Sequence, residues 1–167
     1  PKVWAWREGR VKKIKKFLDH ILLLFRFEKI FFDKEHLKNT FVGHPLLDYS
    51  EKDINVEIKD FVKKKNIVSL FPGSRESEIN ILLPILIEFI KKMNLKDNSY
   101  YYIFHSTKKY KESIYNKLLK DNLSNAEVIS DDKIKSQSLK NSIFAIVKSG
   151  TVSLEVCKYN IPSLIIY

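Results

Sequence analysis

The sequence predicts an α/β fold made of two units, each built around a parallel β-sheet. Short apolar runs alternate with segments of helical period, as in chains of β-α-β units. Two of the four glycines, Gly73 and Gly150, follow apolar runs and precede helical segments, where a strand turns sharply into a helix. A polar, acidic stretch without period at 46–57 interrupts the alternation, which then starts afresh.

The first unit is expected over residues 1–45, followed by a linker over residues 46–60. Apolar residues three and four apart, with lysines between them, predict a basic helix over Val11–Leu24. The stretch Ile21–Phe27 also fits a strand, and its period alone does not decide between the two. A short helix and a strand are expected to complete this unit, at Phe27–Leu37 and Thr40–Val42.

The second unit, residues 61–167, is expected to be a doubly wound parallel sheet. Its strands are predicted at Asn66–Phe71, Tyr100–Phe104, Glu127–Ile129, Ile143–Val147 and Ser163–Tyr167. Its helices are predicted at Glu76–Met93, Lys108–Asp121, Asp132–Lys140 and Thr151–Tyr159. Open α/β sheets of this kind bind ligands at the carboxyl ends of their strands.

The composition is that of an ordered globular chain: 167 residues, 44% hydrophobic and 30% charged, with a net charge of +10. The charge raises the question of a nucleic-acid partner. Only four of the 30 basic residues are arginines, and many lysines fall on expected solvent faces. Most aromatic residues lie in apolar runs rather than between charges, so no nucleic acid is expected. An anionic lipid surface remains a second reading of the charge, and the basic helix either contacts it or packs on the sheet.

Several classes of protein are not expected. No apolar run approaches the roughly 18 residues of a membrane-spanning helix, which favours a cytoplasmic protein with at most peripheral membrane contact. The lone Cys157, expected in the core, and four histidines without ligand spacing predict neither a metal site nor a cofactor. The chain begins without Met and stops within an apolar run, so we expect an internal fragment of a longer protein.

The first candidate ligand loop is formed by Gly73, Ser74 and Arg75, between a strand and a helix. Free N–H groups at a helix start, together with a guanidinium, suit an anion such as phosphate. The alternative is an ordinary strand-to-helix turn with a solvated arginine.

The second candidate loop is formed by Ser149, Gly150 and Thr151, with Glu155 about one helical turn further on. Hydroxyl groups at the start of a helix favour phosphate, and Thr151 is expected to cap that helix. A carboxylate one turn away favours the hydroxyls of a nucleotide ribose. The alternative is a capped helix with a solvent-facing Glu155.

Five stretches, in this order and across nearly the whole chain, resemble the lipid-A-disaccharide synthase family. They are Val3-Trp4-Ala5-Trp6-Arg7 with Arg10; Phe27-Glu28-Lys29; Phe41-Val42-Gly43-His44-Pro45-Leu46 with Asp48; Pro72-Gly73-Ser74-Arg75 with Ser77-Glu78-Ile79 and Leu82-Leu83-Pro84; and Ser149-Gly150-Thr151 with Leu154-Glu155. Lys148 stands where the family has a small residue. It would either reshape the pocket or bring one more cation to a diphosphate.

The resemblance implies an inverting glycosyltransferase of the GT-B type, with two Rossmann-like lobes. This chain would hold the end of the first, acceptor-side lobe and most of the second, nucleotide-sugar-binding lobe. The enzyme would join UDP-2,3-diacylglucosamine to 2,3-diacylglucosamine 1-phosphate, with Arg75 stabilising the departing UDP. The catalytic base would lie outside this chain, and the fragment alone would be inactive.

On the acceptor side, the resemblance points to Trp6, Arg7 and His44. The alternatives are a packed aromatic pair and a histidine that only shapes the crossover into the linker. Another UDP-sugar enzyme of the GT-B type is the nearest competing function, either the peptidoglycan N-acetylglucosaminyl transferase or a UDP-N-acetylglucosamine epimerase. A basic nucleic-acid-binding module is the alternative from a different class.

Overall fold

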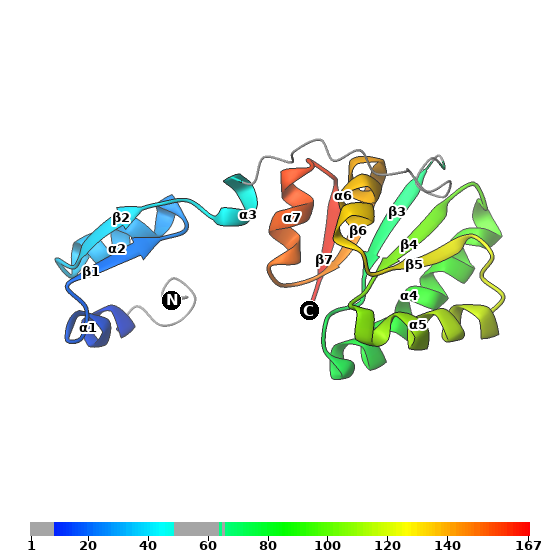
Figure 1. The fold of residues 1–167 in the computed structure, drawn as a ribbon, viewed down its shortest axis with the longest axis horizontal. Helices are drawn as coiled ribbons and strands as arrows, with labels where there is room; N and C mark the ends of the chain where they lie inside the picture. Colours follow the sequence, from blue (N-terminus) through cyan, green and yellow to red (C-terminus); the bar gives the residue numbers. More distant parts are fainter. Residues whose placement is uncertain (1–8, 49–63, 65) are drawn as a thin grey trace. The chain divides into compact units, whose positions relative to one another are not determined.

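The structure, a computed structural model, describes residues 9–48, 64 and 66–167. The chain divides into two compact units, Pro1–Lys52 and Asp53–Tyr167. Each unit has a parallel sheet of its own, two-stranded in the first and five-stranded in the second (Figure 1). The segment expected as a linker lies outside the described residues from residue 49 onward.

The first unit is a small α/β layer around one parallel strand pair. Its elements are α1 (Arg10–Lys15), β1 (His20–Leu23), the 3-10 turn η1 (Arg26–Glu28), α2 (Lys29–Lys34), β2 (Lys38–Phe41) and α3 (Pro45–Asp48). The core of this unit is formed by Val11, Leu23, Phe32 and Leu37, all buried. Only one face of the strand pair is therefore covered by the helices described here.

The basic helix predicted over Val11–Leu24 is wrong. Helix α1 ends at Lys15, and the chain then enters strand β1, as the alternative reading of Ile21–Phe27 allowed. Strand β1 pairs with β2 along its whole length, and Leu23 is completely buried in that pair. Pairing and burial outweigh the helical period, which reflects only local spacing. A long lysine-rich helix that could lie on a membrane is thus not formed.

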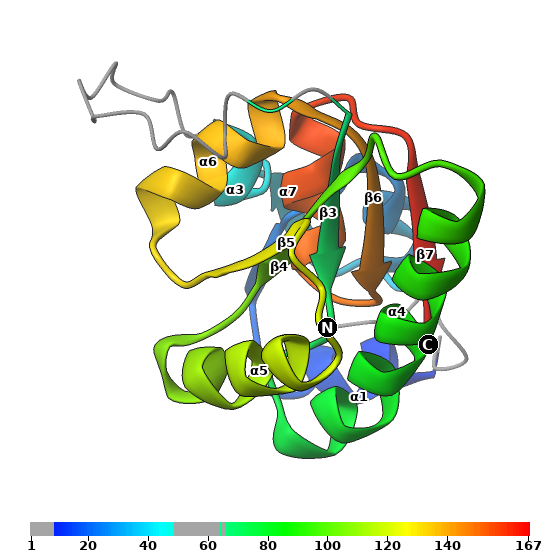
Figure 2. The same ribbon diagram turned by 90° about the vertical axis from the view of Figure 1, so that its right-hand side faces the viewer.

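The second unit is a five-stranded, all-parallel sheet with helices on both faces (Figures 1 and 2). Its strands are β3 (Ile67–Phe71), β4 (Tyr101–His105), β5 (Ala126–Ile129), β6 (Ser142–Lys148) and β7 (Ser163–Ile166). Its helices are α4 (Glu76–Lys96), α5 (Lys108–Lys120), α6 (Asp132–Lys140) and α7 (Val152–Lys158). Helices α4 and α5 cover one face, and α6 and α7 cover the other (Figure 2). The predicted strands and helices of this unit are confirmed, with ends shifted by at most a few residues.

Strand β3 shows why the strands of this unit can be predicted from the sequence. All five of its residues are buried, because side chains on both faces meet helices. Val68 and Leu70 pack in the larger core with α4 and α5, whereas Phe71 packs with α6 and α7 residues on the other face. A strand covered on both sides appears as an unbroken apolar run. Cys157, expected in the core, is exposed, because the short helix α7 buries the neighbouring Val156 instead.

The strand order β5-β4-β3-β6-β7 places the reversal of chain direction across the sheet between β3 and β6. From β3 the chain builds outward to β4 and β5, then returns to the other side of β3 for β6 and β7. The two strands end together, with Phe71 opposite Val147. Ligands bind at such a switch point, because the loops that leave the two strands diverge. Both candidate loops start here.

Candidate functional site

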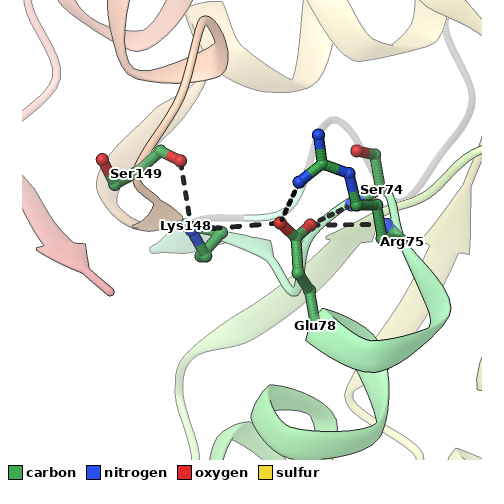
Figure 3. Close-up of polar contacts among 5 residues, drawn as sticks. All are labelled: Ser74, Arg75, Glu78, Lys148 and Ser149. Carbon is green, nitrogen blue, oxygen red and sulfur yellow. Dashed lines mark hydrogen bonds and ion pairs between the residues drawn. The ribbon is translucent and has the colours of Figure 1, made fainter.

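The two glycine-containing loops meet at the carboxyl edge of the second sheet, between β3 and β6 (Figure 3). The contact between them is ionic. Lys148, the last residue of β6, places its Nζ 4.0 Å from Oε1 of Glu78 in the first turn of α4. Sequence analysis correctly placed the two loops at strand ends but did not assign a role to Glu78.

The first loop is built around the Glu78 carboxylate. Its Oε2 accepts hydrogen bonds from the backbone N–H groups of Ser74 (3.0 Å) and Arg75 (3.3 Å). Gly73 has a φ of +112°, and a Cβ at this position would lie 2.6 Å from both Cβ and Oε2 of Glu78. Only glycine therefore allows both this backbone conformation and the approach of Glu78.

The expectation that free N–H groups line this loop is wrong for Ser74 and Arg75, because the backbone N–H groups of both residues donate hydrogen bonds to Glu78. These bonds, with the Ser74 amide contributing most, lower the pKa of Glu78, and the nearby Lys148 and Arg75 charges add to the effect. Burial opposes the shift. The signal in the sequence is an acidic residue at the third position of the helix, one half of a capping box.

Arg75 is held only loosely. Its Nη1 lies 3.7 Å from Glu78 Oε1, and its side chain is 81% exposed. An exposed ion pair of this length contributes little to stability. The guanidinium is thus available to an external anion, at the place where the sequence predicted one.

The second loop differs from the first. Within the described residues Gly150 is not among the glycines of positive φ, and a Cβ there would meet nothing closer than the Lys148 carbonyl at 4.0 Å. Its backbone does not demand glycine, contrary to the expectation of a sharp turn. The absence of a side chain instead leaves the surface open to a close approach.

Not every polar group of the second loop and the helix start forms a hydrogen bond within the described residues. Thr151 is the residue before α7, as expected, but its side chain makes no capping hydrogen bond. The Ser149 N–H donates to the Ile166 carbonyl at 2.8 Å, which ties the loop to β7. Ser153, one turn into the helix, donates its hydroxyl to the Gly150 carbonyl at 2.6 Å. The Thr151 hydroxyl therefore remains available to a ligand.

Glu155 does not simply face solvent. Its Oε2 accepts a hydrogen bond from Lys135 Nζ at 2.5 Å, and the two side chains are only 29% and 23% exposed. Lys135 belongs to α6, twenty residues earlier in the chain, so no local spacing could have pointed to it. The pair fixes the position of the Glu155 carboxylate at the edge of the second loop.

A buried polar chain connects β4, β3, β6 and α6 beneath this edge. Ser142 donates its hydroxyl to the Ser138 carbonyl (2.7 Å), and the Ser142 and Ser69 hydroxyls lie 2.7 Å apart. Since Ser142 has one proton to give, Ser69 donates to Ser142. His105 Nε2, 2.9 Å from Ser69 Oγ, must then donate to Ser69. His105 Nδ1 is left as a buried acceptor without a partner among the described residues.

His105 is uncharged in this environment. It is 6% exposed, and its ring stacks on Phe71 with centroids 4.1 Å apart. Burial holds the pKa of His105 well below its usual range, and the charge of Lys135 lowers the pKa further. The sequence shows no metal-ligand spacing around this histidine and gives no sign of its place in the site. The structure makes it part of the sheet that supports both loops.

Of the three residues expected on the acceptor side, only His44 lies in the described part of the chain. Trp6 and Arg7 lie outside the described residues. His44 lies in the first unit, where its Nδ1 accepts a hydrogen bond from the Leu46 N–H (3.2 Å) and its carbonyl accepts one from Leu47 (2.8 Å). These contacts lie at the start of α3. They agree with the alternative expectation for His44, in which the histidine shapes the crossover into the linker.

In the part of the chain that the structure describes, no three histidine, cysteine or acidic side chains are grouped so as to hold a metal ion. None of the described helices has the length and apolar character needed to cross a membrane.

Solved structures with the same fold define the class. S. aureus MnaA, solved together with UDP, superimposes with a TM-score of 0.69 over 99% of this chain and 48% of that chain, at 15% identity. TarM superimposes with a TM-score of 0.53 over 95% of this chain and 31% of that chain, at 14% identity. The chain shares the α/β fold of these structures, so the predicted fold class is confirmed.

The family follows from sequence comparison. The family model described as lipid-A-disaccharide synthetase matches residues 1–167, and the chain belongs to this family. A lipid-A-disaccharide synthase from Coxiella burnetii (strain Dugway 5J108-111) is 37% identical over all of this chain and 44% of its own length. One from Sulfurihydrogenibium sp. (strain YO3AOP1) is 31% identical over all of this chain and 47% of its own length. The chain thus spans less than half the length of these curated relatives.

Proposed function

We propose that this chain is part of a glycosyltransferase that transfers 2,3-diacylglucosamine from its UDP derivative to 2,3-diacylglucosamine 1-phosphate. The family match supports the reaction, and the UDP in the MnaA structure supports a nucleotide on this fold. The observation that carries the proposal is the pair of loops that start side by side at the switch point, with the exposed guanidinium of Arg75 on the first of them. In this assignment residues 61–167 bind the nucleotide-sugar, and residues 1–45 end the acceptor-side lobe.

Each loop has its own task in this proposal. Arg75 binds the diphosphate, because its guanidinium is exposed and only loosely paired. Ser149, Gly150 and Thr151 supply hydroxyls and an open backbone surface for the same group. Glu155, held by Lys135, accepts hydrogen bonds from the ribose hydroxyls through the carboxylate oxygen that Lys135 does not use. Gly73 and Ser74 shape the first loop around Glu78.

In the chemical step the acceptor's 6-hydroxyl attacks the anomeric carbon of the donor sugar. The bond from that carbon to the diphosphate oxygen breaks, and UDP leaves with the electron pair. The proton of the hydroxyl passes to a carboxylate base, which we assign to a part of the enzyme outside this chain. Negative charge grows on the diphosphate as the bond breaks, and Arg75 is placed to stabilise that charge.

A lipid acceptor requires that the enzyme work at a membrane surface, and we place the protein in the cytoplasm with peripheral membrane contact. Support comes from the first unit, which exposes large apolar side chains and also carries the lysines of α1. They include Phe17, Leu22 and Ile30, with exposed fractions of 83%, 61% and 69%, and Lys12, Lys13 and Lys15. Apolar groups among cations suit an anionic lipid surface.

The test is a transferase assay on the full-length protein with both lipid substrates, combined with calorimetry of UDP and AMP. We expect disaccharide formation and tighter binding of UDP than of AMP. Release of UDP without disaccharide, or equal binding of the two nucleotides, would exclude the proposed reaction or the proposed uridine site. UDP-N-acetylglucosamine is the control donor for the competing GT-B functions.

A further inference from the structure

The strongest feature not used by the proposed function is the ammonium group at the end of β6. Lys148 Nζ donates a hydrogen bond to the Ser149 carbonyl at 3.3 Å and lies 4.0 Å from Glu78 Oε1. The Lys148 side chain is only 24% exposed. The charge is therefore held at the junction of the two loops rather than extended into solvent.

Lys148 and Arg75 share one carboxylate oxygen. Figure 3 shows the two side chains reaching Glu78 from different loops, with Arg75 Nη1 at 3.7 Å and Lys148 Nζ at 4.0 Å from the same Oε1. Both distances exceed that of a charge-assisted hydrogen bond, about 2.7–2.9 Å. The other oxygen, Oε2, is committed to the backbone amides of Ser74 and Arg75. Neither cation thus has a close anionic partner here.

Arg75 and Lys148 share the single carboxylate of Glu78 at this junction. The carboxylate of Glu155, in the helix that follows the second loop, is bound by Lys135. A diphosphate between the loops would give each of the two cations a phosphate oxygen as a close anionic partner.

We propose that Lys148 is a second diphosphate-binding residue, which acts with Arg75 on the nucleotide-sugar; this inference rests on the proposed function. On binding, both cations transfer from Glu78 Oε1 to phosphate oxygens. Glu78 keeps its Oε2 bonds to the loop amides, so the first loop holds its shape while its counter-ion role ends. Lys148 supplies charge, and Arg75 supplies a two-pronged geometry that lysine does not have.

The experiment is calorimetry of the full-length protein with UDP, UMP and uridine, which differ in the number of phosphates. Lys148→Met removes the charge and keeps the length of the side chain. We expect about a 10-fold loss of UDP affinity, a smaller loss for UMP and none for uridine. Lys148→Gln should repeat this order, and Lys148→Arg should restore most of the UDP affinity.

Lys92→Met is the matched control, because Lys92 is an exposed lysine of α4 (72%) whose ion pair within the described residues is with Glu88. It should leave the binding of all three ligands unchanged. Equal losses for UDP and uridine in Lys148→Met, or UDP affinity equal to the control, would overturn the role of Lys148 while leaving the nucleotide site in place. A wild-type protein that binds no UDP would overturn the proposed function and this inference with it.

Discussion

The two loops at the edge of the second sheet look alike in the sequence and are built differently. Each is a glycine followed by a hydroxyl residue, between an apolar strand and a helix. In the first loop, Glu78 accepts hydrogen bonds from two backbone N–H groups and occupies the space where a side chain at Gly73 would lie. This loop is therefore closed by contacts within the protein. The second is open, with ordinary backbone at Gly150 and an unused hydroxyl on Thr151.

The difference shows that a glycine at a strand end has two separate physical causes. Gly73 is required by the protein itself, through its positive φ and the contact with Glu78. Gly150 is not required by any contact among the described residues, and we propose that its missing side chain makes room for a ligand. In this account the first loop provides the positive charge of Arg75 on a hydrogen-bonded backbone. The second loop provides hydroxyl groups and an open surface at Gly150.

The largest expected effect is that of Arg75, the exposed cation of the closed loop. Arg75→Ala should lower kcat by roughly 10²–10³, and Arg75→Lys by about 10–100, because lysine keeps the charge without the paired donors. The thermal unfolding temperature should change little, since the side chain is 81% exposed. Steady-state kinetics with a melt of each variant measure both. Full turnover in Arg75→Ala, or a collapsed melting temperature, would contradict the role.

The second prediction separates the two glycines directly. Gly73→Ala should destabilise the fold by about 2–4 kcal/mol, through strained backbone and a clash with Glu78. Gly150→Ala should change stability by less than about 0.5 kcal/mol. It should instead weaken UDP binding, because a methyl group would occupy the open surface. Denaturant unfolding and calorimetry of both variants measure this, and equal stability losses would remove the distinction between the loops.

The third prediction concerns the carboxylate of the open loop. Glu155→Ala should weaken UDP binding by roughly 10-fold or more, because hydrogen bonds to a charged group are lost. The loss should be much smaller for 2′-deoxy-UDP if Glu155 holds the ribose 2′-hydroxyl. Calorimetry with both nucleotides is the measurement. Unchanged affinity for UDP would take Glu155 out of the ribose site and leave it as the partner of Lys135.

The smallest expected effect concerns His105, in the buried polar chain beneath the two loops. The Ser69–Ser142 hydrogen bond of this chain joins the strands that carry the two loops. Because the pKa of His105 is lowered in the folded state, unfolding takes up a proton below the unfolded value of about 6.5. Stability should be full above that pH and fall by up to about 1.4 kcal/mol per pH unit as pH decreases toward the folded pKa.

Unfolding free energies measured between pH 7.5 and pH 5 test this. His105→Gln cannot titrate and should flatten the profile in this range. The carboxyl groups whose pKa is lowered, such as Glu78, act below this window and should leave it unaffected. An identical slope in wild type and His105→Gln would show that His105 does not control the pH dependence.

The sequence predicts the second unit well and the first unit poorly, for a physical reason. Strand β3 is buried along its whole length and β6 over Ala145–Val147, so the apolar run itself marks each strand. In the first unit β1 has a helical spacing of apolar residues, and only its pairing with β2 makes it a strand. That contact joins residues about twenty positions apart and leaves no local signal.

The same limit applies to the site. The positions of Arg75 and Gly150 follow from strand-helix order alone, which local patterns reveal. The roles of Lys135 and Lys148 depend on which strand ends lie side by side, and that is a property of the sheet order. Glu78 has a local signal, since it is the third residue of its helix, but that spacing does not show that it meets two cations.

The most direct test of the central claim is a crystal structure of the full-length protein with UDP. The account predicts the diphosphate between the two loops, with the Arg75 guanidinium on phosphate oxygens and the hydroxyl of Thr151 within hydrogen-bond distance of the same group. Glu78 should still accept the amides of Ser74 and Arg75. A diphosphate bound elsewhere, with Arg75 still on Glu78, would contradict the account.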